Sequence, residues 1–292
     1  MSLELFEKIC REYVQMGGGY LGFSPLMSEP LVDPLLLTRV RYIRERCPEI
    51  KLYIYTNGIG FSSYSDADLR FLLESFDVLN ISLSILDRED YRSLFGVDKA
   101  EEIGETLARI RRLTSREERS RKLFLHVRTA KKRETLESRA YRDLVDSGFN
   151  CRDVTNTFSD WGGIVRQEDL PPGSELFVPE QPPWSGPCIV PIVSQTVLPN
   201  GEVLACGCFD ARGRHVMGNA ETQTLEQIWT GESYRLFRLS FQENSCPRIC
   251  RSCIMYCPCD SLISLPCFVR FDPARDNFWL TFMRYGDRIQ KR

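Results

Sequence analysis

The chain has 292 residues, of which 42% are hydrophobic and 27% are charged, and its formal net charge is −2. This composition excludes a disordered chain, and the charge supplies no global field that would attract nucleic acid or a membrane surface. The sequence contains no apolar run as long as a membrane span and no signal segment, so we expect a cytoplasmic protein without nucleic-acid or membrane partners.

The first half of the chain alternates predicted helices and strands. Apolar residues at helical spacing, Ser2 as an N-cap and a glycine stop predict a first helix over 2–19. Further helices are predicted at 33–48, 65–76, 98–113 and 133–149, and strands at 20–24, 51–58, 77–85, 122–130 and 151–157. This alternation predicts a parallel α/β sheet, with ligands bound by the loops that follow the strands.

The front of this domain is unusual because it opens on a helix, and no strand precedes residues 20–24 to pair with them. An uncovered apolar sheet edge favours aggregation. We therefore expect that a first strand is missing and that the sequence as given is truncated at its N-terminal end.

A basic stretch, residues 109–142, holds thirteen Lys or Arg against four acidic residues. It lacks the interleaved aromatic residues that stack on bases, and therefore indicates solvated helix faces rather than a nucleic-acid site. The loop 156–163 should lie at the ligand face, where Asn156, Asp160 and Trp161 either touch substrate or belong to a tight turn with Trp161 packed beneath it.

Proline-rich residues 166–187 predict a linker between the halves. Beyond it, 188–208 has the pattern of a β-hairpin with a Pro-Asn-Gly turn, and 224–241 that of one amphipathic helix. Twelve cysteines occur in the chain, and nine of them lie between 188 and 267.

Clustered thiols in a reducing compartment indicate metal ligands more often than disulfides. Zinc favours paired Cys-x2-Cys knuckles, of which Cys250 and Cys253 form one, whereas iron–sulfur clusters accept freer spacing. The only histidines are His126 and His215. Spacing alone leaves iron–sulfur and zinc both open.

The cysteine region resembles the SPASM domain, an auxiliary iron–sulfur module of radical S-adenosylmethionine (SAM) enzymes. Cys188, twelve residues, Gly201, four residues and Cys206 match its opening, and Cys250, Cys253 and Cys259 match its Cys-x2-Cys-x5-Cys signature. The intervening "GNAETQTLEQIWTGESY" is similar to the module's helix entry.

The first half resembles the radical SAM partial barrel. The segment "LMSEPLVDP" stands where that family has its Gly-Gly-Glu-Pro turn, "YTNG" matches the turn after the next strand, and "NISLS" resembles the strand that reaches the SAM ribose. The resemblance implies SAM-binding roles for seven residues: Ser28, Glu29, Pro30, Thr56, Asn57, Gly58 and Ser82.

The sequence departs from the family pattern at three places. No Cys-x3-Cys-x2-Cys triplet, which would bind the SAM-reducing cluster, occurs near the front; Cys246, Cys250 and Cys253 have that spacing but follow a helix. Met27 and Ser28 replace the two glycines of the turn. Ile263 stands where the SPASM pattern continues with a cysteine.

The resemblance implies one auxiliary 4Fe-4S cluster and leaves a second open. One assignment gives one cluster Cys250, Cys253, Cys259 and Cys267, and the other Cys188, Cys206 and two of Cys208, Cys246 and Cys257. The leaner alternative is a single cluster on Cys188, Cys206, Cys250 and Cys253. We expect Cys10, Cys47 and Cys151 to be buried apolar residues.

The sequence thus predicts an α/β fold: a partial (β/α) barrel over 1–165 that lacks its first strand, a linker over 166–187, a small cysteine-rich α+β iron–sulfur domain over 188–270, and a tail over 271–292. The resemblance implies radical chemistry on a peptide or small molecule, with flavodoxin or ferredoxin as electron donor. The alternatives are a non-catalytic iron–sulfur electron relay and structural zinc.

Overall fold

The computed structural model describes residues 1–23, 29–84, 88–177, 188, 190–207, 210–242, 245–251, 253 and 256. The chain divides into two compact units, and the segments that form them alternate along the sequence. The first unit comprises Met1–Tyr20, Cys47–Ile50 and Pro179–Arg292, and the second comprises Leu21–Arg46 and Lys51–Val178. The domain boundaries expected from the sequence remain a prediction.

The second unit is built on a five-stranded sheet in the order β1-β2-β3-β4-β5, and the neighbouring strands from β2 to β5 run parallel. All five strands lie where the sequence predicts strands. They are β1 Tyr20–Phe23, β2 Lys51–Thr56, β3 Val78–Leu83, β4 Leu123–Arg128 and β5 Asn150–Thr155. A shorter parallel pair joins β6 Thr157–Phe158 to β7 Glu175–Leu176.

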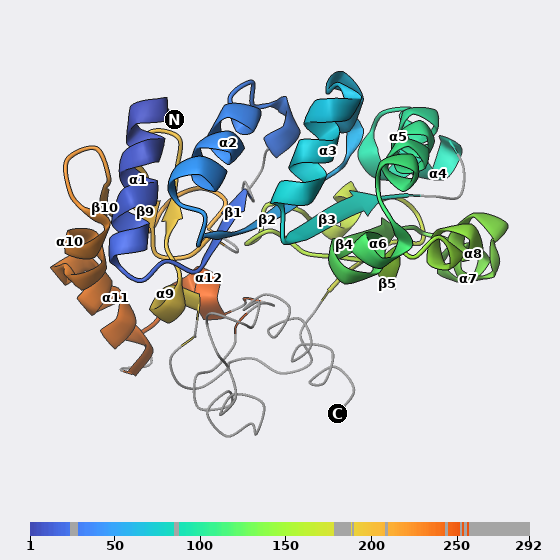
Figure 1. Cartoon of the computed structure of the whole chain (residues 1–292). Helices are drawn as coiled ribbons and strands as arrows, with labels where there is room; N and C mark the ends of the chain where they lie inside the picture. Colours follow the sequence, from blue (N-terminus) through green and yellow to red (C-terminus); the bar gives the residue numbers. More distant parts are fainter. Residues whose placement is uncertain are drawn as a thin grey trace, which may run out of the picture. The chain divides into compact units, whose positions relative to one another are not determined.

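Helices follow the strands, as Figure 1 shows for α2 and α3, which lie over the same face of the sheet. The helices of the second unit are α2 Leu36–Arg46, α3 Asp66–Ser75, α4 Arg88–Phe95, α5 Ala100–Leu113, α6 Arg116–Lys122, α7 Lys132–Glu137 and α8 Arg139–Asp146. Three 3-10 turns supplement them: η1 Pro30–Val32, η2 Ile59–Ser63 and η3 Gln167–Asp169. The predicted α/β class is confirmed.

The two faces of this sheet differ in chemistry. Ile54, Leu79 and Leu125 are fully buried on one face. The other face carries Asn80 and His126, which the strand register places on the same side. Because parallel sheets are usually apolar on both faces, a polar face is the one available for ligands.

Two helix predictions need correction. Residues 133–149 form two helices rather than one, because the Ser138 hydroxyl accepts a hydrogen bond from the Tyr141 backbone N at 3.0 Å and starts α8 anew. Residues 224–241 likewise divide at Gly231 into α10 Leu225–Thr230 and α11 Glu232–Gln242. Helices α4 and α6 were not predicted.

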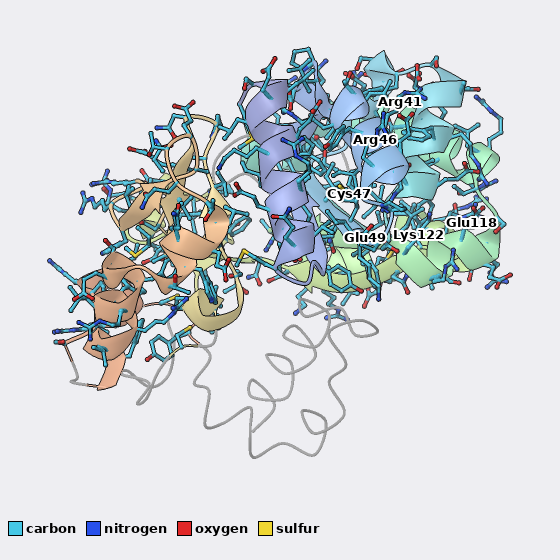
Figure 2. The ribbon with its side chains drawn as sticks, turned by 60° about the vertical axis from the view of Figure 1, so that its left-hand side comes forward. Arg41, Arg46, Cys47, Glu49, Glu118 and Lys122 are labelled. Carbon is cyan, nitrogen blue, oxygen red and sulfur yellow. The ribbon has the colours of Figure 1, made fainter. Side chains whose placement is uncertain are left out.

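The basic stretch is partly structural. Lys122, labelled with Glu118 on α6 in Figure 2, is 5% exposed and donates to the Leu73 and Glu74 carbonyls of α3. Arg119 is equally buried, at 6%, and donates from Nε to the Ser147 carbonyl at 2.7 Å. These two cations bind backbone carbonyls within the fold, and are not presented to a partner.

The first unit joins the N-terminal helix α1 Leu3–Gln15 to the cysteine region. A three-stranded antiparallel sheet runs β10-β9-β8, from Val216–Asn219 through Glu202–Leu204 to Thr196–Val197. The predicted hairpin is therefore present but shorter, because Val190–Val193 forms the helical turn α9, and β10 was not predicted. Helices α10 and α11 precede α12 Arg248–Arg251.

Helix α1 is part of this unit's core. Its Leu5 and Ile9 pack in one buried cluster with Cys188 and Ile228. Lys8 Nζ donates to the Ala220 carbonyl at 2.7 Å. Along the described part of the chain, no helix has both the length and the apolar character needed to cross a bilayer.

Candidate functional site

Two candidate sites follow from the fold, and the first lies at the carboxyl ends of β1 and β2. Glu29 ties the loops after these strands together. Its carboxylate accepts hydrogen bonds from the Leu31 backbone N at 3.1 Å, from the Asn57 backbone N at 2.7 Å and from the Thr56 hydroxyl. The turn after β1 is thereby held against the turn after β2.

The Thr-Asn-Gly turn after β2 is itself tightly fixed. The Thr56 hydroxyl accepts from the Gly58 N at 2.9 Å, and the Asn57 side-chain oxygen accepts from the Ile59 N at 3.0 Å. Gly58 has φ +76°, a left-handed conformation that glycine adopts without strain, and an added Cβ would lie 3.0 Å from Ile81 Cγ2. Glycine is therefore required here by both backbone and packing.

The polar face of the sheet continues from this turn across β3 and β4. Asn80 donates to the Ile54 carbonyl at 3.3 Å, and its side-chain oxygen lies 3.0 Å from His126 Nε2. The Tyr55 ring lies 5.8 Å from the His126 ring, centroid to centroid. Ser82 is paired in register with His126, so its side chain belongs to this same face.

The structure thus brings Glu29, Thr56, Asn57 and Gly58 together, with Pro30 opening the turn η1 beside them. Ser82 lies one strand further, next to Ile81, which contacts the Gly58 position. Ser28 lies outside the described residues. Sequence reasoning did not identify the linked Asn80 and His126, although their shared parity on adjacent predicted strands was a usable signal.

The loop 156–163 forms a structural turn. Asn156 donates to the Gly173 carbonyl at 3.1 Å, and the Asp160 carboxylate accepts from the Gly162 N at 3.0 Å. Trp161 has φ +48° and is 40% exposed. A non-glycine residue with such a left-handed φ is strained by roughly 1–3 kcal/mol. The hydrogen bonds of Asn156 and Asp160 hold the turn in this conformation, and the Trp161 side chain is partly exposed.

The second site is a cysteine cavity in the first unit. Four thiols from separate segments line this cavity, which has a volume of about 30 Å³. Cys188 precedes α9, Cys206 follows β9, and Cys250 and Cys253 lie on and just after α12. The remaining lining is Val190, Pro191, Phe237, Phe241 and Tyr256.

The thiols are close enough to interact. Burial raises the pKa of the Cys250 thiol far above its ordinary value, and the neighbouring Cys206, Cys188 and Cys246 raise it further. A cavity that disfavours free thiolates in this way holds them only when a positively charged metal compensates their charge. No three potential ligands among the described residues converge on a single point as they would around one bound ion.

Two structural groups support the cavity. The Tyr234 hydroxyl donates to the Leu204 carbonyl at 3.1 Å beneath the Cys206 segment. Arg238 lies over the Trp229 ring at 4.0 Å from its centroid, and its Nε donates to the Pro191 carbonyl at 3.2 Å. These contacts fix β9 and α9, the elements that lie next to Cys206 and Cys188 in the chain.

Of the other cysteines, Cys10 and Cys47 are buried as expected, at 0% and 3% exposure. Cys151 on β5 and Cys246 are only partly buried, so the expectation of a buried Cys151 was wrong. Cys208, Cys257, Cys259 and Cys267 lie outside the described residues, so any role for them as ligands remains a prediction.

A buried acidic residue next to this site was not identified from the sequence. Asp210 is 2% exposed and accepts hydrogen bonds from the His215 backbone N at 2.7 Å and the His215 Nδ1 at 3.1 Å. It also contributes to the raised pKa of Cys250. No periodicity or motif marked Asp210, because its burial depends on the tertiary fold.

Comparison with known proteins agrees with this arrangement. Residues 188–254 match the SPASM family model, described as an iron–sulfur cluster-binding domain. No curated protein sequence matches the chain significantly.

Several solved structures share the fold. BtrN in complex with AdoMet and 2-DOIA is 19% identical, with 83% of this chain and 75% of that chain covered and a TM-score of 0.52. Native anSMEcpe with bound AdoMet and Cp18Cys peptide is 14% identical over 99% and 92% of the two chains, with a TM-score of 0.53. Native anSMEcpe with bound AdoMet is 14% identical, with 98% of this chain and 90% of that chain covered and a TM-score of 0.54.

The match to the SPASM model covers the segment that carries the four cavity thiols, and the structural similarity extends over most of the chain. The chain therefore has the fold of the BtrN and anSMEcpe structures, and its residues 188–254 match an iron–sulfur cluster-binding domain.

Proposed function

We propose that this chain is the SAM-binding barrel and auxiliary iron–sulfur unit of a radical SAM enzyme that modifies a peptide or small molecule. The observation that carries the proposal is the cavity lined by Cys188, Cys206, Cys250 and Cys253. Four thiols from three separate segments suit a 4Fe-4S cluster, which is large enough to be bound from several loops.

This ligand set corresponds to a single auxiliary cluster. Cys246 acts on Cys250 electrostatically but does not line the cavity. The aromatic wall of Phe237, Phe241 and Tyr256 excludes water, which protects a cluster and influences its potential.

The SAM site is proposed at the carboxyl ends of β1 to β3, because structures of the same fold bind AdoMet and parallel α/β sheets bind ligands at the carboxyl ends of their strands. Glu29 fixes the turn whose backbone would meet the SAM amino group, and Asn57 and Gly58 form the adjoining wall. Ser82, on the neighbouring strand β3, is proposed to contact the ribose.

Bound SAM together with a reducing cluster would supply radical chemistry for hydrogen abstraction from a substrate. Residues 1–245 contain no Cys-x3-Cys-x2-Cys triplet, so the residues of this chain do not fit that reducing cluster. The tasks assigned to this chain are therefore SAM binding, substrate orientation and retention of the auxiliary cluster.

The substrate is proposed to be a peptide or a small polar molecule. The related structures contain 2-DOIA in one case and a peptide in the other. Flavodoxin or ferredoxin remains the proposed electron donor.

The test is anaerobic reconstitution of the 292-residue chain with iron and sulfide, followed by measurement of both per chain. We expect close to four of each, together with SAM binding by calorimetry. Cys250→Ser should lower the iron content and leave SAM binding unchanged, because the cavity lies in the other unit. Zinc in place of iron and sulfide would contradict the proposal and support a structural metal site.

The missing triplet favours a second candidate, a non-catalytic iron–sulfur electron relay. Reconstituted chain incubated with SAM and dithionite, with SAM binding measured in parallel, separates the two. Formation of 5′-deoxyadenosine excludes the relay, whereas a loaded chain that neither binds SAM nor forms this product supports it.

A further inference from the structure

A buried carboxylate lies beside the cysteine cavity. Asp210 is 2% exposed and follows Cys206 by four residues, between β9 and β10. Its carboxylate accepts hydrogen bonds from the backbone N of Arg214 at 2.9 Å and from the N and Nδ1 of His215 at 2.7 and 3.1 Å. The segment is closed by the Ala205 N, which donates to the His215 carbonyl at 3.0 Å.

His215 links this carboxylate to the cavity wall. The His215 ring contacts the Phe237 ring edge to face, with centroids 5.7 Å apart, and Phe237 lines the cavity. Burial is the main cause of the raised pKa of the Cys250 thiol, and Asp210 is among the charges that raise it further. The carboxylate is therefore within electrostatic reach of the site.

Burying the Asp210 carboxylate costs hydration free energy. A buried carboxylate is destabilising unless hydrogen bonds compensate its lost hydration, and the three bonds from Arg214 and His215 supply this compensation. A negative charge next to a cluster opposes the arrival of an electron, and a wall of aromatic side chains screens that repulsion poorly.

We propose that Asp210 sets the reduction potential of the auxiliary cluster by placing a fixed negative charge beside it, with His215 as the residue that orients the carboxylate. Asp210 does not line the cavity and acts on the cluster through its charge. Its charge favours the oxidised cluster and lowers the potential. This inference rests on the proposed iron–sulfur function of the four thiols.

The test is an EPR-monitored redox titration of the full, reconstituted chain. Asp210→Asn keeps the hydrogen-bond acceptor and removes the charge, so the equilibrium constant for reduction should rise about tenfold, or about 59 mV for a one-electron couple. Asp210→Glu keeps the charge and should retain the wild-type potential.

Glu12→Gln is the matched control. Glu12 belongs to the same unit as Asp210, and its side chain is likewise mostly buried, at 16% exposure. Its carboxylate binds Lys8 Nζ and the Leu225 backbone N, each at 2.9 Å, and does not line the cavity. Neutralising it should leave the potential unchanged. If the loss of a buried carboxylate acted only through the structure, Asp210→Asn and Glu12→Gln would both lower stability, and neither would specifically raise the potential.

If Asp210→Asn carries the wild-type amount of iron and has an unchanged potential, the inference about Asp210 is wrong, while the proposed iron–sulfur function still stands. If Asp210→Asn loses iron, Asp210→Glu decides. Wild-type iron content and wild-type potential in Asp210→Glu support the charge effect. Loss of iron in this variant too, or a shift of its potential by about 59 mV, overturns it. Wild-type chain that takes up no iron and sulfide refutes the proposed function, and the charge effect with it.

Discussion

Replacing Glu29 with alanine tests whether its carboxylate holds the SAM-binding turns together. The wild-type carboxylate accepts from the Leu31 N, the Asn57 N and the Thr56 hydroxyl. Glu29→Ala removes all three bonds at once. Glu29→Gln keeps one carbonyl acceptor but no charge, and therefore serves as the intermediate variant.

The expected magnitude follows from these bonds. A hydrogen bond contributes about 1 kcal/mol net, and those to a charged group somewhat more. Three bonds give about 3 kcal/mol, since the side chain of Glu29 is only partly buried and water replaces part of the loss. For a unit of this size, that loss lowers the melting temperature by roughly 6–12 °C. SAM affinity should fall at least about tenfold, because the turn is no longer preorganised.

Thermal unfolding followed by far-UV circular dichroism measures the first effect, and titration calorimetry with SAM measures the second. Glu29→Gln should give about half of the melting shift. Wild-type melting and SAM affinity in Glu29→Ala would refute the role of this carboxylate. Reduced stability with normal SAM affinity would restrict Glu29 to folding.

Three further predictions concern the first unit and the edge of the sheet. Cys253→Ser should at least halve the iron retained after reconstitution, measured colorimetrically, while Cys151→Ser on β5 should retain it. Gly201→Ala should lower the free energy of unfolding in urea by about 1–3 kcal/mol, since Gly201 has φ +81° and a Cβ would lie 2.6 Å from Asn219 Oδ1; an unchanged midpoint contradicts this. Burial raises the pKa of Cys10 from 9.0 to about 12, so the folded state keeps a proton that the unfolded state releases, and stability declines from about pH 9 upward. Urea unfolding of the metal-free chain at pH 8 and pH 10.5 should show a smaller decline in Cys10→Ala than in the wild type, and equal declines would contradict the assignment.

The parallel sheet could be predicted because each strand is a short apolar run followed by an amphipathic helix. The helix breaks were harder. Ser138 lies within a continuous helical pattern, and only its hydrogen bond to the Tyr141 N shows that it is a cap. Propensity alone does not distinguish an exposed serine within a helix from a capping serine.

The candidate sites were predicted to different extents. Spacing and resemblance gave nine candidate cysteines, with Cys188, Cys206, Cys250 and Cys253 only as the leaner of two assignments, and the structure places these four around one cavity. Asp210 could not be found in this way, because its role depends on burial and on hydrogen bonds that form only in the folded segment. Glu29 was selected for its motif, but its function as a link between two turns became visible only from its partners.

The position of α1 in the cysteine-bearing unit has a consequence for the timing of metal loading. Lys8 binds the Ala220 carbonyl across 212 residues of sequence, and Leu5 and Ile9 complete the core that contains Cys188. At about 5–20 residues per second, α1 leaves the ribosome roughly 10–40 s before its partners. The cavity can close only afterwards, when Cys250 and Cys253 have also emerged. Until then the thiols made first are exposed to oxidants, so iron delivery and reducing conditions should control the yield of active protein more than chain synthesis does.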